Sequence, residues 1–309
     1  MKKLFTILAV AAAVVACQKN ETIALDNGEA IAFGNAFVEN STRADYSSTD
    51  INTINVYGTV NNVLIYDYTP VTRPSDVAGE GYNDNWTCNV KQYWIEGATY
   101  KFAALVDVPQ ANITPDQYGM PASFTYTADG QTDVLYDYYT TTGKAKNQNT
   151  TVPFTFKHLL SKVYFTVSNL IDDSKYTYTI SEVMLLNTRP DGTYTVYTTD
   201  NGTGAWAAKS ALTNTAFASI ENVAFGTDKT NTALLLIPTE TTKVGVSFKV
   251  TLSISGKEVS SYTYSKADVT TLAQNNVYNF NISLSDLEQI NFTVTAKPQW
   301  TSPENESAL

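Results

Sequence analysis

The sequence predicts an all-β protein made of β-sandwich modules, on two observations. Its 309 residues include 20 Tyr and 13 Phe but only three Met and one His, and aromatic residues favour strands. Apolar residues also recur at every second position through much of the chain, with no long helical period of 3.6 residues. The length is about twice that of a common single domain, which favours two domains.

The alternation places the expected strands. It is clearest at 244–254, where Val, Phe, Leu and Ile alternate with Gly, Ser, Lys and Thr, as in a strand with one buried face. The run 233–237 lacks alternation, which indicates either a strand buried on both faces or a crossing between sheets. Asp129-Gly130, Asp191-Gly192 and Asn201-Gly202 are expected turns. In chain order the expected strands are 51–60, 63–68, 100–106, 124–127, 163–167, 176–186, 194–198, 244–254, 278–284 and 290–296.

The first 17 residues are expected to be a lipoprotein signal peptide. Lys2 and Lys3 precede an apolar run that is too short to span a bilayer as a helix. The run ends in Val14-Val15-Ala16-Cys17, which resembles a bacterial lipobox. Cys17 would then be the lipidated first residue of the mature protein, followed by a polar tether.

A polar stretch at 143–151 separates the expected strands into two groups. Its Lys, Asn and Gln residues precede the apolar Phe154-Thr155-Phe156. We therefore expect an N-terminal β-sandwich at 44–150 and a C-terminal β-sandwich at 151–309.

Composition excludes several classes of function. The net charge is −10 and no run of Lys or Arg could follow a line of phosphates, so nucleic acid is not an expected partner. Two Cys and one His cannot form a Cys/His zinc site. The chain has no Gly-x-Ser-x-Gly elbow and no phosphate-binding glycine loop. We expect no catalytic residues, metal or cofactor, and we expect His158 to be a packed, hydrogen-bonded residue.

Five segments in order along the chain resemble the bacterial fimbrillins, the type V pilin subunits. No single one of these segments is specific, and the resemblance rests on their order and spacing over the whole chain. The five segments are the lipobox at Cys17, Ile31-Ala32-Phe33, Thr42-Arg43-Ala44, the block 156–163, and the ending in which 276–282 leads to 290–294 and Trp300.

The resemblance implies a fold and a mechanism. The fold would be two transthyretin-like β-sandwich domains in tandem. The protein would be exported as an outer membrane lipoprotein, exposed at the cell surface, and cleaved after an Arg by a trypsin-like protease. Its first strand, within 18–43, would be discarded, and a strand from a neighbouring subunit would fill the groove that remains. The implied partners are other fimbrial subunits, in a homopolymer or with tip and anchor proteins, the outer membrane and the processing protease.

The residues give this scheme candidate sites. Ile31, Phe33 and Phe37 share one face of an extended segment and would form the removable strand. Ile290, Phe292 and Val294 repeat the same spacing over their first positions and would form the donor strand.

The expected processing site is Arg43-Ala44. The chain has three Arg, and two of them, Arg73 and Arg189, are followed by Pro. Trypsin-like enzymes cleave such bonds poorly. Arg43 also lies in a polar stretch of the kind that proteases reach.

Two other classes of function stay open at this point. A monomeric surface lipoprotein or a tip adhesin could bind glycan or host protein through Trp86, Trp94, Trp206 and Trp300. Aromatic residues at alternating positions are more often part of the core or of cross-strand pairs. A hydrolase is the third class, and the missing catalytic motifs argue against it.

Overall fold

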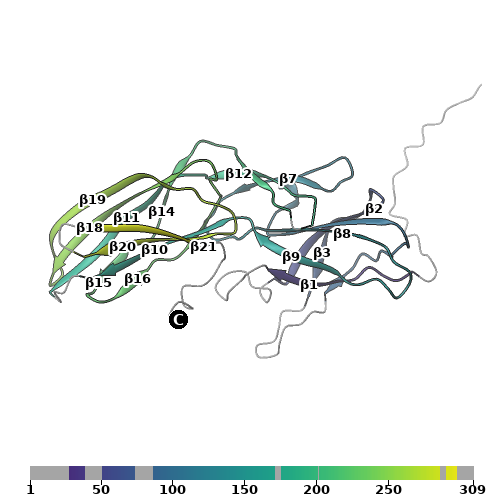
Figure 1. Ribbon diagram of the computed structural model, residues 1–309, viewed down its shortest axis with the longest axis horizontal. Coiled ribbons are helices and arrows are strands. Elements are labelled where there is room, and N and C mark those ends of the chain that lie inside the picture. The colour runs from purple at the N-terminus through teal and green to yellow at the C-terminus, as the bar shows by residue number, and fades with distance from the viewer. Residues whose placement is uncertain are drawn as a thin grey trace, which may run out of the picture.

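The computed structural model describes residues 28–38, 51–73, 86–170, 175–200, 202–285 and 290–297. These residues form strands and one short 3-10 helix, η1 (Gln110–Asn112), in an elongated molecule (Figure 1). The expected all-β class is therefore confirmed. Most sheet neighbours are antiparallel, and two pairs of strands are parallel.

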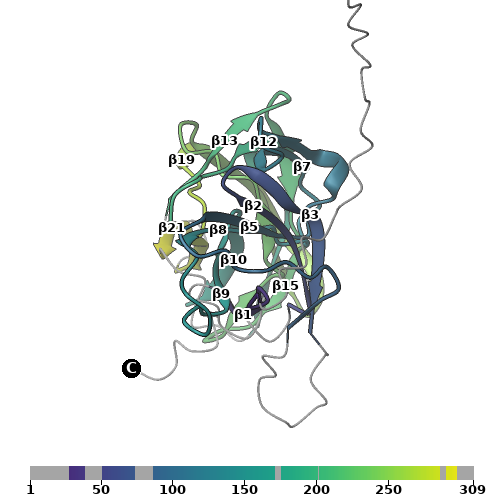
Figure 2. The same cartoon turned by 90° about the vertical axis from the view of Figure 1, so that its right-hand side faces the viewer.

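The first sheet occupies one end of the molecule and curls strongly. Figure 2 looks onto this end and shows β9, β8, β5, β2 and β3 following a curve, with β1 beside β9. Its two faces contact two different cores, because Phe102 and Ala104 point into one and Ala103 and Leu105 into the other. Its strands, in spatial order, are β1 (Phe33–Val38), β9 (Val152–His158), β8 (Leu135–Thr142), β5 (Thr99–Val106), β2 (Thr53–Val60), β3 (Val63–Thr72) and β4 (Thr87–Cys88).

A smaller sheet covers one face of the first. Its aromatic residues Phe124, Tyr194 and Trp206 are buried in a core that also contains Tyr57 and Tyr136 of the first sheet. Its strands, in spatial order, are β13 (Ala205–Ala208), β12 (Asp191–Thr195), β7 (Pro121–Thr127) and β6 (Ile113–Pro115).

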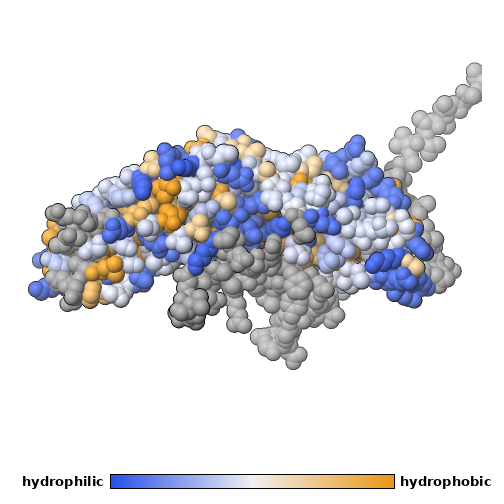
Figure 3. Space-filling model, in the orientation of Figure 1, coloured by the Kyte–Doolittle hydropathy of each residue, from blue (hydrophilic) through white to orange (hydrophobic). Residues whose placement is uncertain are grey.

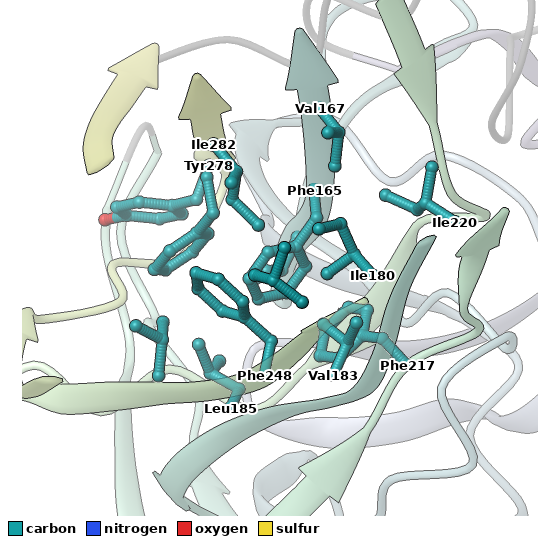
Figure 4. Packing of buried hydrophobic residues seen from close by; sticks show 14 of the residues in the cluster. Phe165, Val167, Ile180, Val183, Leu185, Phe217, Ile220, Phe248, Tyr278 and Ile282 are labelled. Carbon is teal, nitrogen blue, oxygen red and sulfur yellow. The ribbon is translucent and has the colours of Figure 1, made fainter. Parts of the chain in front are cut away.

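The other end of the molecule is a β-sandwich of two sheets. Figure 4 shows Phe165, Ile180 and Phe248 from the two sheets pointing toward one another. One sheet contains β16 (Asp228–Thr230), β10 (Ser161–Asn169), β20 (Val277–Leu284) and β21 (Ile290–Lys297), with β17 (Leu234–Leu236) also paired to β10. The other contains β14 (Thr213–Ala216), β11 (Tyr176–Thr188), β18 (Val244–Ile254) and β19 (Lys257–Thr270), with β15 (Ile220–Val223) also paired to β11.

The unalternating run 233–237 crosses between the two ends of the molecule. Leu235 and Ile237 are buried in the core beneath the smaller sheet, whereas Leu236 is buried in the C-terminal sandwich. Because successive side chains of a strand point in opposite directions, this run needs apolar residues at every position. The missing alternation therefore has the expected cause, burial of the run on both faces at a crossing between sheets.

Strand pairing crosses the expected domain boundary between residues 150 and 151. β9 follows the boundary but pairs with β1 and β8. β12 and β13 also follow it, and β12 pairs with β7. The number and limits of the domains therefore stay a prediction.

One expected turn was wrong. Asp191 and Gly192 lie inside β12, in register with Thr127 and Tyr126 of β7, and the bend falls at Pro190 instead. The strand expected at 194–198 accordingly begins at Asp191 and ends at Thr195. The pairing partner β7 overrode the local turn preference of Asp-Gly.

Candidate strand-exchange site

Three of the expected site residues, Cys17, Arg43 and Ala44, lie outside the described residues. The others fall in two places that do not meet within one chain. Ile31 and Phe33 belong to the core of the first sheet, whereas Phe292 and Val294 pack against the core of the C-terminal sandwich. The side chains of Phe37 and Ile290 also lie outside the described set.

Segment 28–38 joins the two ends of the first sheet. On one side the Ile31 N–H donates to the Gln92 carbonyl at 2.8 Å, and the Trp94 N–H donates to the Glu29 carbonyl at 2.9 Å. On the other side the Val152 N–H donates to the Ala32 carbonyl at 2.8 Å. Residues 92–94 follow β4 at one end of the strand order, and β9 is the neighbour of β1 at the other end, so this segment closes the curled sheet. Its loss would leave unpaired backbone groups on both sides.

Phe33 fills the space between the two ends of this sheet. Its ring centroid lies 5.3 Å from that of Tyr66 in β3, 6.0 Å from Phe102 in β5 and 6.2 Å from Phe154 in β9. Phe33 is 4% exposed and Ile31 is 6% exposed. Burial of these two side chains contributes about 3–6 kcal/mol to the stability of the closed sheet.

A bulge changes the register of β1. Phe33 is in register with Val152, and the register then shifts between Gly34 and Ala36. Ala36 pairs with Phe154, and Phe37 pairs with Thr155. The simple alternation from Ile31 through Phe33 to Phe37 is therefore interrupted in the backbone.

Glu29 clamps the start of this segment to the turn before β9. Its Oε2 accepts hydrogen bonds from the Asn147 backbone N–H at 2.9 Å and from Asn149 Nδ2 at 2.8 Å. The bond from the Asn149 side chain, with the bond from the Asn147 backbone, lowers the pKa of Glu29. The residues expected in the removable strand were Ile31, Phe33 and Phe37, and Glu29 was not among them. Its one signal in the sequence is its place two residues before Ile31.

The first half of β9 depends on side-chain support. The ladder between β9 and β8 lies in the second half of β9, where Lys157 pairs with Tyr136 and His158 pairs with Leu135. At Thr155 the backbone N–H donates instead to Asp137 Oδ2 at 2.7 Å. Burial raises the pKa of Asp137 to about 6. β1 supports the other side of the same half of β9.

The proposed donor residues form an edge of the C-terminal sandwich. Phe292 is half-buried, and its ring lies 5.8 Å from Tyr264, 6.0 Å from Phe280 and 6.3 Å from Phe248. Val294 is also half-buried, in register with Phe280. β21 pairs with β20 on one side and ends the strand order of its sheet. Within one chain, these residues complete their own sandwich.

Two of the three arginines are buried and hold backbone carbonyls. Arg73 is 5% exposed, and its Nε donates to the Ile51 carbonyl at 2.8 Å. Arg189 is 9% exposed, and its Nη1 donates to the Pro238 carbonyl at 2.8 Å. A protease that reads an Arg side chain would have to unfold the chain to reach either of them.

His158 is a packed, hydrogen-bonded residue, as expected from the sequence. The residue is fully buried, and its Nδ1 lies 2.5 Å from Asp133 Oδ2. This confirms the expected packed, hydrogen-bonded histidine. Among the described residues, no group of three or more His, Cys, Asp or Glu side chains could hold a metal ion.

In the part of the chain that the structure describes, no helix is long and apolar enough to cross a membrane.

Comparisons with known proteins identify relatives. A family model described as fimbrillin-like matches residues 42–300. A fimbrial protein from Bacteroides vulgatus has a similar fold, with a TM-score of 0.59, 13% identity, and coverage of 87% of this chain and 100% of that one. Candidate cell adhesion proteins from Bacteroides uniformis and Bacteroides ovatus have TM-scores of 0.55 and 0.54, each with 17% identity. They cover 88% and 89% of this chain, and 99% of their own chains. A comparison with curated proteins gives no match.

Proposed function

The chain belongs to the fimbrillin-like family, and we propose that it is a structural subunit of bacterial surface fimbriae. In this proposal it is exported as a lipoprotein with Cys17 as the lipidated residue. Cleavage after Arg43 then removes the leader, the tether and the first strand. The processed subunits polymerise by strand exchange. This role is structural and not enzymatic.

The position of segment 28–38 carries the proposal. It supplies Ile31 and Phe33 to a core that is otherwise built from residues 51–156. It also precedes Arg43, so one cut in the chain separates this part of the core from the rest. Strand exchange requires a core strand that a single cleavage can remove, and segment 28–38 meets this requirement.

The buried arginines support Arg43 as the processing site. Pro follows both Arg73 and Arg189 in the sequence. Burial of both side chains adds an independent reason, because a folded subunit would keep them from a trypsin-like protease. Arg43 is the remaining Arg of the chain.

Lipidation at Cys17 would hold the uncleaved subunit at the outer membrane. Two or three acyl chains bind a bilayer far more firmly than one, at about 0.8 kcal/mol per buried CH₂. Cleavage after Arg43 would release the subunit from this anchor and open its groove in the same step. Polymerisation would thus be confined to subunits that have reached the protease.

β21 is the proposed donor. It is an edge strand whose Phe292 and Val294 are half-buried, so it loses fewer contacts on leaving its sandwich than a central strand would. In an acceptor groove it would gain a second neighbour strand.

The competing glycan-binding function has little support in the structure. Trp94 is 7% exposed and Trp206 is 5% exposed, and both are part of cores. Trp86 packs under the Arg73 guanidinium at 5.1 Å. On the face shown in Figure 3, residues of high hydropathy form small separate patches.

Mass spectrometry of the N-terminus of surface protein tests the proposal. We expect Ala44 as the first residue of polymerised protein and lipidated Cys17 as the first residue of the Arg43→Ala variant. That variant should remain monomeric at the membrane, whereas the neighbouring Thr42→Ala should process normally. Fibres of normal length from Arg43→Ala would contradict the proposal.

A further inference from the structure

A five-residue pattern occurs twice in this chain. Segment Glu29-Ala30-Ile31-Ala32-Phe33 and segment Glu288-Gln289-Ile290-Asn291-Phe292 both have the form Glu-x-Ile-x-Phe, which occurs nowhere else in the sequence. The first copy lies between residues 92–94 and β9. The second copy includes Ile290 and Phe292, two of the three proposed donor residues.

Buried and exposed positions alternate along the first copy of the pattern. Ile31 and Phe33 are buried, whereas Ala30 and Ala32 are exposed. The second copy has apolar residues at the two buried positions and the polar Gln289 and Asn291 at the two exposed ones. The polarity of the second copy therefore matches the burial of these positions at least as well as that of the first copy does.

The position after the pattern also accepts the second copy. A Cβ added at Gly34 would lie 3.4 Å from the Thr151 Cβ, which is ordinary contact with an exposed side chain. The counterpart of Gly34 is Thr293, so a Thr–Thr contact would form there. The match does not extend upstream, because a Cβ at Gly28 would lie 3.0 Å from the Tyr93 Cβ, and its counterpart is Leu287.

We propose that residues 288–293 of a second copy of this chain take the places of residues 29–34, with Glu288 accepting the hydrogen bonds that Glu29 accepts. This inference rests on the proposed function and specifies the register of the exchange. Asn147 and Asn149 direct two donors, the backbone N–H and Nδ2, at the position two residues before the first buried side chain. A strand shifted by two residues would place Ile290 or Asp286 at that point. Ile290 would offer these two donors no acceptor, and Asp286 would put the charged Glu288 in the buried place of Ile31.

Disulfide cross-linking tests the register directly. Processed subunits that carry Thr151→Cys are mixed with processed subunits that carry Thr293→Cys, both in a Cys88→Ser background, under mild oxidation. The expected Cβ separation is close to the usual range of a disulfide. We expect efficient cross-linking for Thr293→Cys and little for Thr295→Cys, which is equally exposed but two residues further along. The reverse preference would overturn the proposed register.

A binding cycle tests the clamp. A peptide of residues 286–297 is titrated into the processed subunit, and Glu288→Ala should weaken binding about tenfold, since it removes two hydrogen bonds to a charged acceptor. Asp286→Ala removes the same charge outside the pattern and should have little effect. Asn149→Asp in the acceptor keeps the oxygen that accepts from the Lys144 N–H but removes the Nδ2 donor. It should weaken binding of the wild-type peptide and reduce the further loss caused by Glu288→Ala, because only the Asn147 N–H would still donate to Glu288.

The outcomes separate this inference from the proposed function. If the wild-type peptide binds and the subunits polymerise, but Glu288→Ala and Asn149→Asp act additively or not at all, the clamp is wrong and strand exchange stands. If neither binding nor polymer is seen after cleavage, the proposed function fails and the inference fails with it.

Discussion

Replacing Phe33 with Ala should destabilise the uncleaved protein and leave the processed subunit unaffected. Phe33 is 4% exposed and contacts the rings of Tyr66, Phe102 and Phe154. Truncation of a buried Phe to Ala costs about 3–5 kcal/mol, because the surrounding rings relax only partly into the cavity. At about 2–4 °C per kcal/mol, the melting temperature should fall by roughly 6–20 °C. After cleavage at Arg43 the variant and the wild type have the same sequence.

The assay is thermal unfolding of residues 18–309, followed by circular dichroism, before cleavage and after the cut segment has been removed. Phe225→Ala is the matched control, since Phe225 is 42% exposed and its truncation should cost less than about 0.5 kcal/mol. The wild type should itself become less stable on losing the segment. If it melts at the same temperature with and without residues 18–43, segment 28–38 is not part of the core and the reasoning is refuted.

Three further predictions concern other parts of the molecule. The folded state keeps Asp137 protonated up to about pH 6, whereas the unfolded state releases this proton near about pH 4. The free energy of unfolding should therefore fall by on the order of 2–3 kcal/mol as pH rises from about 4 to about 6. Denaturant titrations of Asp137→Asn should lack that decrease, and an unchanged decrease would exclude Asp137 as its source. Phe292→Asp should abolish insertion of β21 into a neighbouring subunit and lower the melting temperature of the monomer. The processed subunit of this variant should still bind a wild-type peptide of residues 286–297. Normal fibres from this variant would refute the donor role. Cys17→Ser should prevent incorporation of radiolabelled fatty acid, and label in this variant would show that another residue is acylated.

Sequence alternation predicted most of the strands because it is a local property. The strand expected at 244–254 is β18 (Val244–Ile254), with Val246, Phe248 and Val250 fully buried. The strand expected at 290–296 is β21, one residue longer. In both, the pleat sends alternate side chains to core and solvent, so the pattern can be read without knowing the partner strand.

The partners of each strand could not be predicted in the same way. Phe33 pairs with Val152, more than one hundred positions further along the chain, and in parallel orientation. The Asp191-Gly192 pair has the chemistry of a turn but continues a strand, because β7 offers it hydrogen bonds. Such choices depend on which edges are available after the rest of the sheet has formed.

The sequence by itself determined the all-β class, most strand positions, the resemblance to the fimbrillins and Arg43 as the one Arg that Pro does not follow. Only the tertiary structure decided that segment 28–38 closes the first sheet, that Arg73 and Arg189 are buried, and that Glu29 is clamped by Asn147 and Asn149. The physical reason is the range of the interactions. Side-chain periodicity follows from the geometry of two neighbouring residues, whereas burial and hydrogen-bond partners follow from contacts between segments that only the folded chain brings together.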